Sequence, residues 1–347
     1  GPSTQGLPHL RIRHRDTHVI GLWLENGQLT LNTTLPDPVP LVNEALVRVV
    51  GAGICNTDLE LIRGYYPYTG VLGHEFVGVV EQAPTGFEHL EGQRVVGEIN
   101  ATCANCNACH AGRETHCENR TVLGILARNG AFAEYLTLPA RNLHALPDSL
   151  PNEVAVFTEP LAAALQIQEQ ITLHPANRVL VVGDGKLGQL IARSLQQTGC
   201  YLCVAGRHKN KLAMLSNLAI NTFLVDRQTS VNPDPINQLL NFDVAIECTG
   251  NTEGFEFALR ALRPRGTLVL KSTYADRLTL DISSLVVDEI TLVGSRCGPF
   301  KSAIKLLRDG TVPVKELITD RYPLAAALTA FDRAQQPGTL KVLLQIS

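Results

Sequence analysis

The chain has 347 residues, 45% of them apolar, and a formal net charge of −3 at pH 7. This length accommodates two domains with separate hydrophobic cores. The near-neutral charge excludes the basic footprint of a nucleic-acid-binding protein, and no apolar run reaches the length that spans a membrane.

The first residues are basic rather than apolar, which distinguishes them from a secretory signal. A basic cluster at residues 11–15 has no apolar core behind it, and Gly1-Pro2-Ser3 is typical of an expression scar. We therefore expect residues 1–17 to be an extension outside the fold. The nine cysteines are odd in number and partly clustered. They favour metal binding in a reducing cytoplasm over a disulfide framework.

Short β-strands are predicted for the first third of the chain. Asn26-Gly27 between two apolar runs indicates a β-hairpin. From the cysteine cluster to Leu138 we expect loops. Further strands are predicted at residues 45–50, 77–82 and 93–96.

A helix predicted at 153–171 marks a change in pattern, because strands and helices alternate after it. This alternation is typical of βαβ units and a parallel sheet. The chain ends with helices at 302–308 and 324–334 and a strand at 341–346. The alternating strands are predicted at 178–182, 201–205, 223–225, 243–248 and 266–270, and the helices at 187–198, 209–218, 235–240 and 253–262.

A glycine-rich loop follows the strand at 178–182 and opens a helix. A GxGxxG pattern in this context is typical of a dinucleotide site, in which the helix N-terminus faces the pyrophosphate. The alternative is a plain turn that binds nothing. The candidate cofactor residues in the loop are Gly183, Asp184, Gly185, Lys186, Leu187 and Gly188.

The next strand ends without the carboxylate that usually binds the ribose of NAD. Gly206 occupies that position and Arg207 follows it. Because a guanidinium can bind a 2′-phosphate in a bidentate manner, we hypothesise that NADP(H) is preferred. Arg207 would be the main contact, with His208 or Lys211 assisting. The alternative is a solvated basic loop with NAD or dual preference.

A cysteine and a histidine, both of which are candidate metal ligands, lie in one short segment of the sequence. Cys55 and His74 are side chains that Zn²⁺ favours, and Asp58 and Glu75 are acidic neighbours that could orient them. Glu159, far along the chain, could be a third ligand. Three protein ligands leave a fourth position open, as in a catalytic zinc site.

A second metal site is predicted where four cysteines follow the spacing CxxCxxCx7C. Four thiolates can close a tetrahedral shell, as in structural zinc, and the segment is too poor in apolar residues to fold on burial alone. An iron–sulfur cluster is the main alternative. The four residues are Cys103, Cys106, Cys109 and Cys117.

Together these motifs resemble the zinc-dependent medium-chain dehydrogenases/reductases of the alcohol dehydrogenase superfamily, closest to the polyol and threonine dehydrogenase branches. The resemblance implies a GroES-like β-rich catalytic domain (18–163 and 297–347) and a Rossmann-type doubly wound parallel sheet (164–296). It implies hydride transfer between NADP(H) or NAD(H) and an alcohol or polyol, or the matching ketone or aldehyde. It also implies a cytoplasmic homodimer or homotetramer.

The resemblance also assigns roles at the zinc. Cys55, His74 and Glu159 become the ligands of the catalytic ion, and Asp58 supports them. Glu75 adjoins the metal and in some relatives exchanges onto it.

Proton transfer and cofactor binding are assigned in the same way. Thr57 matches the hydroxyl residue that relays the alcohol proton. Glu60 stands where some relatives carry a relay histidine, so the proton leaves through Glu60 or through water. Thr249 and Gly250 match a cofactor-contacting loop, and Lys341 matches a basic pyrophosphate contact.

Other interpretations stay open at this point. The chain could be a regulatory protein that binds NADP(H) and holds only a structural zinc. A zinc-independent enone or quinone reductase would lack both zinc motifs. Tyr65, Tyr66 and Tyr68 could line a substrate pocket or pack a loop. Four further cysteines are expected in the core, namely Cys200, Cys203, Cys248 and Cys297.

Overall fold

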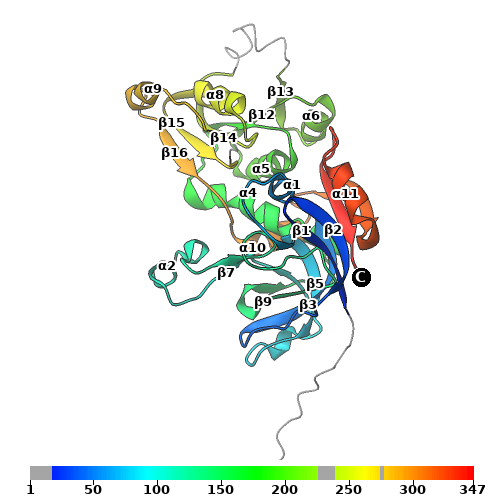
Figure 1. Ribbon diagram of the computed structural model, residues 1–347. Coiled ribbons are helices and arrows are strands. Elements are labelled where there is room, and N and C mark those ends of the chain that lie inside the picture. The colour runs from blue at the N-terminus through cyan, green and yellow to red at the C-terminus, as the bar shows by residue number, and fades with distance from the viewer. Residues whose placement is uncertain (1–17, 226–238, 274–276) are drawn as a thin grey trace, which may run out of the picture.

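The computed structural model describes residues 18–225, 239–273 and 277–347. The chain forms a largely antiparallel β-rich part and a parallel sheet flanked by helices (Figure 1). The N-terminal extension lies outside the described residues, and so does most of the helix predicted at 235–240. Among the described residues no helix is both long and apolar enough to cross a bilayer.

The predicted N-terminal hairpin is confirmed. Strand β1 (Val19–Glu25) pairs antiparallel with β2 (Gln28–Leu35), and the short β4 (Gly70–Val71) adds to the other side of β1. Asn26 and Gly27 both have positive φ, as a two-residue hairpin turn of this kind requires.

The main antiparallel sheet has the order β10-β6-β5-β3-β18-β17, with β9 also paired to β3. The C-terminal strand β18 therefore lies beside β3, which comes from the first third of the chain. Loops were predicted up to Leu138, so β9 was missed. The strands are β3 (Glu44–Gly53), β5 (Glu75–Gln82), β6 (Arg94–Gly97), β9 (Tyr135–Pro139), β10 (Leu143–Ala145), β17 (Ile318–Pro323) and β18 (Lys341–Gln345).

The cysteine-rich segment forms a small lobe. It contains the two-stranded sheet of β7 (Asn100–Ala101) and β8 (Thr121–Val122) and the short helix α2 (Asn107–His110).

The helix predicted at 153–171 is divided into α3 (Asn152–Ala155) and α4 (Thr158–Gln170). Pro160 explains the division, because proline lacks the N–H that a helix interior needs but is tolerated in a first turn. The new helix start places Glu159 in the first turn of α4.

The parallel sheet has the order β13-β12-β11-β14-β15-β16. Counted within the sheet this is 3-2-1-4-5-6, the order of a Rossmann fold. Strand β16 was not predicted, because its four residues are too short a run to stand out. The strands are β11 (Arg178–Val182), β12 (Tyr201–Gly206), β13 (Asn221–Leu224), β14 (Phe242–Glu247), β15 (Leu262–Leu270) and β16 (Thr291–Gly294).

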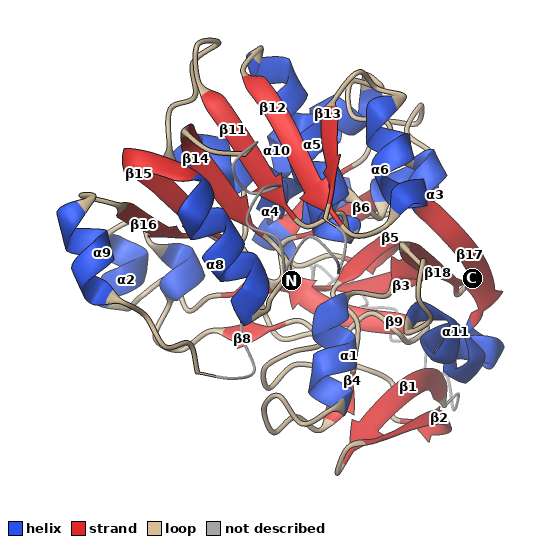
Figure 2. Cartoon of the chain, turned by 90° about the horizontal axis from the view of Figure 1, so that it is seen from above, coloured by secondary structure: helices blue, strands red, loops and turns tan. Residues whose placement is uncertain are grey.

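Helices cover both faces of this sheet (Figure 2). Val179 and Val181 pack in one core cluster with residues of α4 and α5, whereas Leu180 and Val182 pack in another with residues of α8. This alternation within β11 explains its continuous apolar run. The remaining helices are α1 (Asn56–Ile62), α5 (Lys186–Leu195), α6 (Lys209–Ser216), α8 (Thr252–Ala261), α9 (Ile282–Val287), α10 (Phe300–Arg308) and α11 (Ala327–Ala334).

Candidate active site

The register of two neighbouring strands brings the first two candidate ligands together. In the antiparallel pair β3–β5, Gly53 lies opposite Glu75. Cys55 follows the end of β3 and His74 precedes the start of β5, so both emerge at the same edge of the sheet. One ligand atom each from Cys55, His74 and Glu75 can be chosen within 4.8 Å of the others.

Asp58 holds both of these residues in place. Its Oδ2 accepts a 2.8 Å hydrogen bond from the backbone N–H of Cys55, and its Oδ1 lies 3.3 Å from Nδ1 of His74. Asp58 is fully buried. Burial lowers the pKa of His74, but Asp58 and Cys55 more than offset this, so the pKa is raised well above its ordinary value. These contacts are those expected of an orienting partner, and the role of Asp58 toward a metal stays a prediction.

Sequence reasoning missed the helix that carries Asp58. Helix α1 begins directly after Cys55, and Asp58 at its third position closes a capping box with the Cys55 backbone. An acidic residue three positions after the cap is a recognised helix-start signal. The sequence Cys55-Asn-Thr-Asp58 therefore contained the sign of this helix.

The two carboxylate oxygens of Glu75 have different surroundings. Its Oε2 forms a buried ion pair with Nζ of Lys341 on β18, whereas its Oε1 is buried without a hydrogen-bond partner among the described residues. A buried carboxylate oxygen without a partner is costly. A metal ion beside Cys55 and His74 would satisfy it, so the donor set fits zinc.

The same ion pair affects the interpretation of Lys341, which is only 2% exposed. In this structure its ammonium is engaged by Glu75. The contact with a cofactor pyrophosphate stays a prediction.

Glu159 lies in the first turn of α4, near enough to His74 and Glu75 for their charges to influence its carboxyl. Burial raises the pKa of its carboxyl to about 7, and the nearby charges that influence it include His74, Glu75 and Lys341. Glu159 does not belong to the group of residues, Cys55, His74 and Glu75, whose ligand atoms lie within 4.8 Å of one another. The structure thus groups Glu75, rather than Glu159, with Cys55 and His74. The role of Glu159 as third ligand stays a prediction.

The two residues predicted to move the proton are placed differently. Oγ1 of Thr57 lies 3.8 Å from Sγ of Cys55, next to the candidate metal position. The carboxylate of Glu60 instead accepts a 2.7 Å hydrogen bond from Arg63 at the surface. Tyr68 contacts the backbone carbonyls of Val71 and Arg128 through its hydroxyl, which favours loop packing for this residue.

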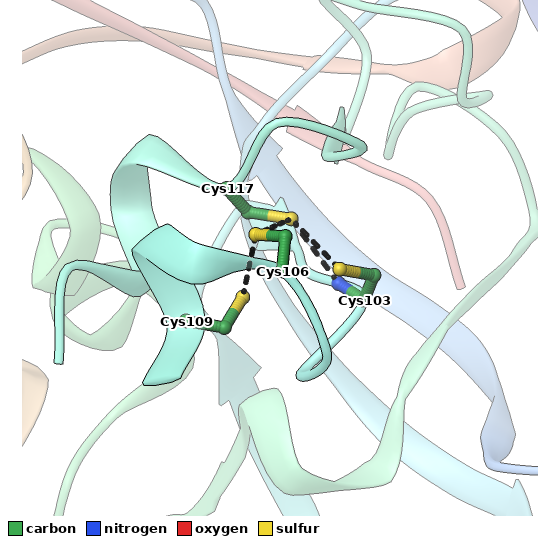
Figure 3. Close-up of side chains that lie close together, drawn as sticks. All are labelled: Cys103, Cys106, Cys109 and Cys117. Carbon is green, nitrogen blue, oxygen red and sulfur yellow. Dashed lines mark hydrogen bonds between the residues drawn. The ribbon is translucent and has the colours of Figure 1, made fainter. Parts of the chain in front are cut away.

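The four lobe cysteines converge in space (Figure 3). Sγ of Cys106 lies 3.5 Å from Sγ of Cys109 and 3.8 Å from Sγ of Cys117, which is 3.4 Å from Sγ of Cys103. With Zn–S bonds of about 2.3 Å, the sulfur atoms of a tetrahedral site lie roughly 3.8 Å apart. These separations fit one ion and leave no room for a multi-iron cluster among the sulfurs.

All nine cysteines are free thiols. Cys203 is buried, whereas Cys200, Cys248 and Cys297 are partly exposed and pack against the core clusters.

A cavity of about 570 Å³ lies at the carboxyl ends of β11, β12 and β14. This is the topological switch point, where Rossmann folds bind dinucleotides. Gly183, Asp184, Gly185, Gly206, Arg207, His208, Lys211 and Thr249 line it, together with Asn56 of α1.

The remaining predicted cofactor residues support this cavity from its edges. A Cβ on Gly188 would collide with the carbonyl of Gly183, so this glycine allows the close helix–strand packing that was predicted. Nζ of Lys186 donates a 3.0 Å hydrogen bond to Oδ1 of Asn56. Leu187 packs against the core, and Gly250 has a φ of 73° in the turn after β14.

The predicted selector residues already have acidic partners. Arg207 forms an ion pair with Glu253, which also lines the cavity. His208 donates its backbone N–H to Oδ2 of Asp184 at 2.7 Å, and its Nδ1 lies 2.9 Å from Oδ1. Asp184 was predicted as a cofactor residue, but neither its pairing with His208 nor that of Glu253 with Arg207 was predicted from the sequence.

Two family descriptions cover most of the chain. "Alcohol dehydrogenase GroES-like domain" matches residues 42–148, and "Glucose dehydrogenase C-terminus" matches residues 152–346, which is more than half of the chain.

Relatives with similar sequences are dehydrogenases. D-arabitol-phosphate dehydrogenase of Enterococcus avium is 28% identical, over 87% of this chain and 90% of that protein. L-threonine 3-dehydrogenase of Cutibacterium acnes is 31% identical, over 89% of this chain and 93% of that protein.

Solved structures of dehydrogenases share the fold. One from Sinorhizobium meliloti 1021, described as zinc-binding and bound to NADP, has a TM-score of 0.85 and 26% identity. One from Escherichia coli CFT073, described as a short chain alcohol dehydrogenase complexed with NADH, has a TM-score of 0.87 and 25% identity. Each comparison covers 95% of this chain and 99% of the other. The predicted fold class is confirmed.

We predict that Cys106→Ser removes one of two zinc ions per chain. Three thiolates and a hydroxyl bind zinc more weakly than four thiolates, and the lobe depends on the metal for its folding energy. Mass spectrometry of the metals in the purified protein should give about two zinc ions for the unchanged chain and about one for the variant. Cys200→Ser, outside the lobe, should retain both. A variant that keeps two ions, or a chain that holds iron in the lobe, would contradict this assignment.

Proposed function

The chain belongs to the zinc-dependent medium-chain dehydrogenases of the alcohol dehydrogenase superfamily, and we propose that it transfers a hydride between NADP(H) and an alcohol or polyol, or the matching ketone or aldehyde. One observation carries this proposal. Asn56, which follows the candidate ligand Cys55, lines the same cavity as the glycine-rich loop and accepts a hydrogen bond from Lys186 of that loop. The candidate metal-binding segment and the glycine-rich loop thus meet at one cavity.

Cys55, His74 and Glu159 would hold the catalytic zinc, with Glu75 beside it. When bound, the ion supplies a Lewis acid that polarises the oxygen of the substrate. Asp58 fixes the positions of Cys55 and His74. The hydroxyl of Thr57 would pass the proton of the alcohol away from the centre. Water would then carry it out, because Glu60 is engaged by Arg63.

The cofactor's phosphates would lie at the N-terminus of α5, where Gly185 leaves open space and Lys186 adds positive charge. Burial lowers the pKa of Lys186 to about 8. The protein's share of the reaction is to hold the nicotinamide against the substrate, since the hydride chemistry belongs to the cofactor.

A preference for NADP(H) rests on Gly206 and Arg207 at the end of β12. Of the two solved structures described above, one is bound to NADP and the other to NADH, so similarity alone does not choose between the cofactors. Arg207 lines the cavity and can exchange its partner Glu253 for a phosphate.

The substrate class follows the relatives named above, whose names give a sugar-alcohol phosphate and a hydroxy amino acid as substrates. We extend this to a secondary alcohol or polyol for this chain. We also propose a homodimer or homotetramer, because β16 is an edge strand that exposes Leu292, and α9 nearby exposes Val286 and Val287. The free thiols and thiolate sites suit a reducing cytoplasm.

Activity on a panel of alcohols and carbonyls, assayed with and without a chelator, tests the proposal. We predict oxidation of at least one polyol that is lost on chelation and restored by Zn²⁺. Cys55→Ala should lower kcat/KM by about a thousandfold, since a Lewis acid contributes several kcal/mol to the transition state. Cys200→Ala, outside the cavity, is the matched control. Full activity in the chelated protein would contradict the proposal.

Cofactor preference gives a separate prediction. Arg207→Ala should weaken NADP⁺ binding by about ten- to hundredfold, because a charged hydrogen-bonding partner of the 2′-phosphate is lost. NAD⁺ binding should change little. Lys209→Ala removes a neighbouring exposed charge that does not line the cavity, and it should leave both affinities unchanged. Calorimetric titration of the unchanged chain and the two variants measures the dissociation constants for both cofactors, and an equal loss for both cofactors in Arg207→Ala would contradict the role of Arg207.

A further inference from the structure

We propose that Asp184 is a further specificity-determining residue, which supplies from the glycine-rich loop the carboxylate that β12 lacks. Its charge favours the ribose 2′-hydroxyl of NAD(H) and opposes the 2′-phosphate of NADP(H). This inference rests on the proposed dinucleotide site and deepens it.

The placement of Asp184 carries the argument. A Cβ on Gly206 would collide with the Asp184 carboxylate, so this carboxylate fills the space that a side chain from the end of β12 would enter. Asp184 is only 5% exposed, yet it lines the cofactor cavity. An acidic group therefore stands at the ribose end of the cavity even though the strand ends in glycine.

The hydrogen bonds of Asp184 leave it capacity for a ligand. Oδ2 of Asp184 accepts a hydrogen bond from the backbone N–H of His208, and Oδ1 lies within hydrogen-bond distance of the ring nitrogen Nδ1 of His208. An ionised carboxylate has about four lone-pair sites, so each oxygen can accept a further bond from a ribose hydroxyl. A 2′-phosphate offers no such donor when ionised and would lie near a like charge.

Other charged residues that line the cavity also attract or repel a 2′-phosphate, and the effect of Asp184 adds to theirs. Arg207 and Lys211 attract a phosphate. Burial lowers the pKa of Lys211, and the charge of Asp184 offsets part of this lowering. Glu253 competes with a phosphate for Arg207. The site therefore combines attraction and repulsion toward a 2′-phosphate, which keeps NAD(H) usable beside NADP(H).

Binding of NADP⁺ and NAD⁺ to the full zinc-loaded chain tests the inference. Asp184→Asn removes the charge, while its amide can still accept the His208 N–H and donate to the ring. The ratio of the NAD⁺ to the NADP⁺ dissociation constant should rise about tenfold, with NADP⁺ bound more tightly and NAD⁺ more weakly. An unchanged ratio, or an equal change for both cofactors, would overturn it.

Two further variants keep the test decisive. Asp184→Ala also removes the charge and should shift the ratio in the same direction, so it replaces the asparagine variant if that one does not fold in a thermal melt. Glu256→Gln removes a charge from an exposed residue that lines the same cavity, and it should leave the ratio unchanged. If Glu256→Gln shifts the ratio of the dissociation constants equally, the shift follows from the loss of any negative charge at the cavity. That result would overturn the specific role of Asp184.

The ratio of the NAD⁺ to the NADP⁺ dissociation constant in the unchanged chain tests the proposed function separately. A chain that prefers NAD⁺ contradicts the proposed NADP(H) preference, but a tenfold shift in Asp184→Asn would still support the role of Asp184. A chain that binds neither dinucleotide would overturn both.

Discussion

The pairing of Gly53 with Glu75 is the constraint on which the candidate zinc site depends. A slip of one residue between β3 and β5 would turn alternate side chains to the other face and separate Cys55 from His74. The buried ion pair between Glu75 and Lys341 adds the C-terminal strand to this arrangement. Removing one partner of such a pair typically costs about 3–5 kcal/mol, so β18 helps to hold the strand that carries the candidate ligands.

A second constraint comes from the parallel sheet. Its strand order places the glycine-rich loop at the switch point, and the close contact of Gly188 with Gly183 sets α5 against β11. The hydrogen bond from Lys186 to Asn56 then joins this loop to the helix that follows Cys55. A hydride donor and a polarising metal are useful only if they face each other, and this contact lies where they would meet.

Local patterns in the sequence predicted the features that depend on local chemistry. Asn26-Gly27 predicted the hairpin, the apolar run before Gly183 predicted β11, and the cysteine spacing predicted the lobe. The sequence did not predict contacts between distant residues. Glu253 pairs with Arg207 from 46 positions away, and Asp184 fills the space beside Gly206 from a different loop. Both depend on strand order, which motif spacing does not encode. The start of α4 at Thr158 could have been predicted from the sequence, because a proline such as Pro160 favours the first turn of a helix.

We expect this chain to hold a second, open zinc site in addition to the closed cysteine site. Anomalous X-ray scattering at the zinc edge, from crystals of the zinc-loaded protein, would locate both ions. We expect two peaks, one among the sulfurs of the lobe and one bound by Cys55, His74 and Glu159 beside the cofactor cavity. A single peak in the lobe, with Cys55 and His74 free of metal, would rule out the open site and favour a dinucleotide-binding protein with only a structural zinc.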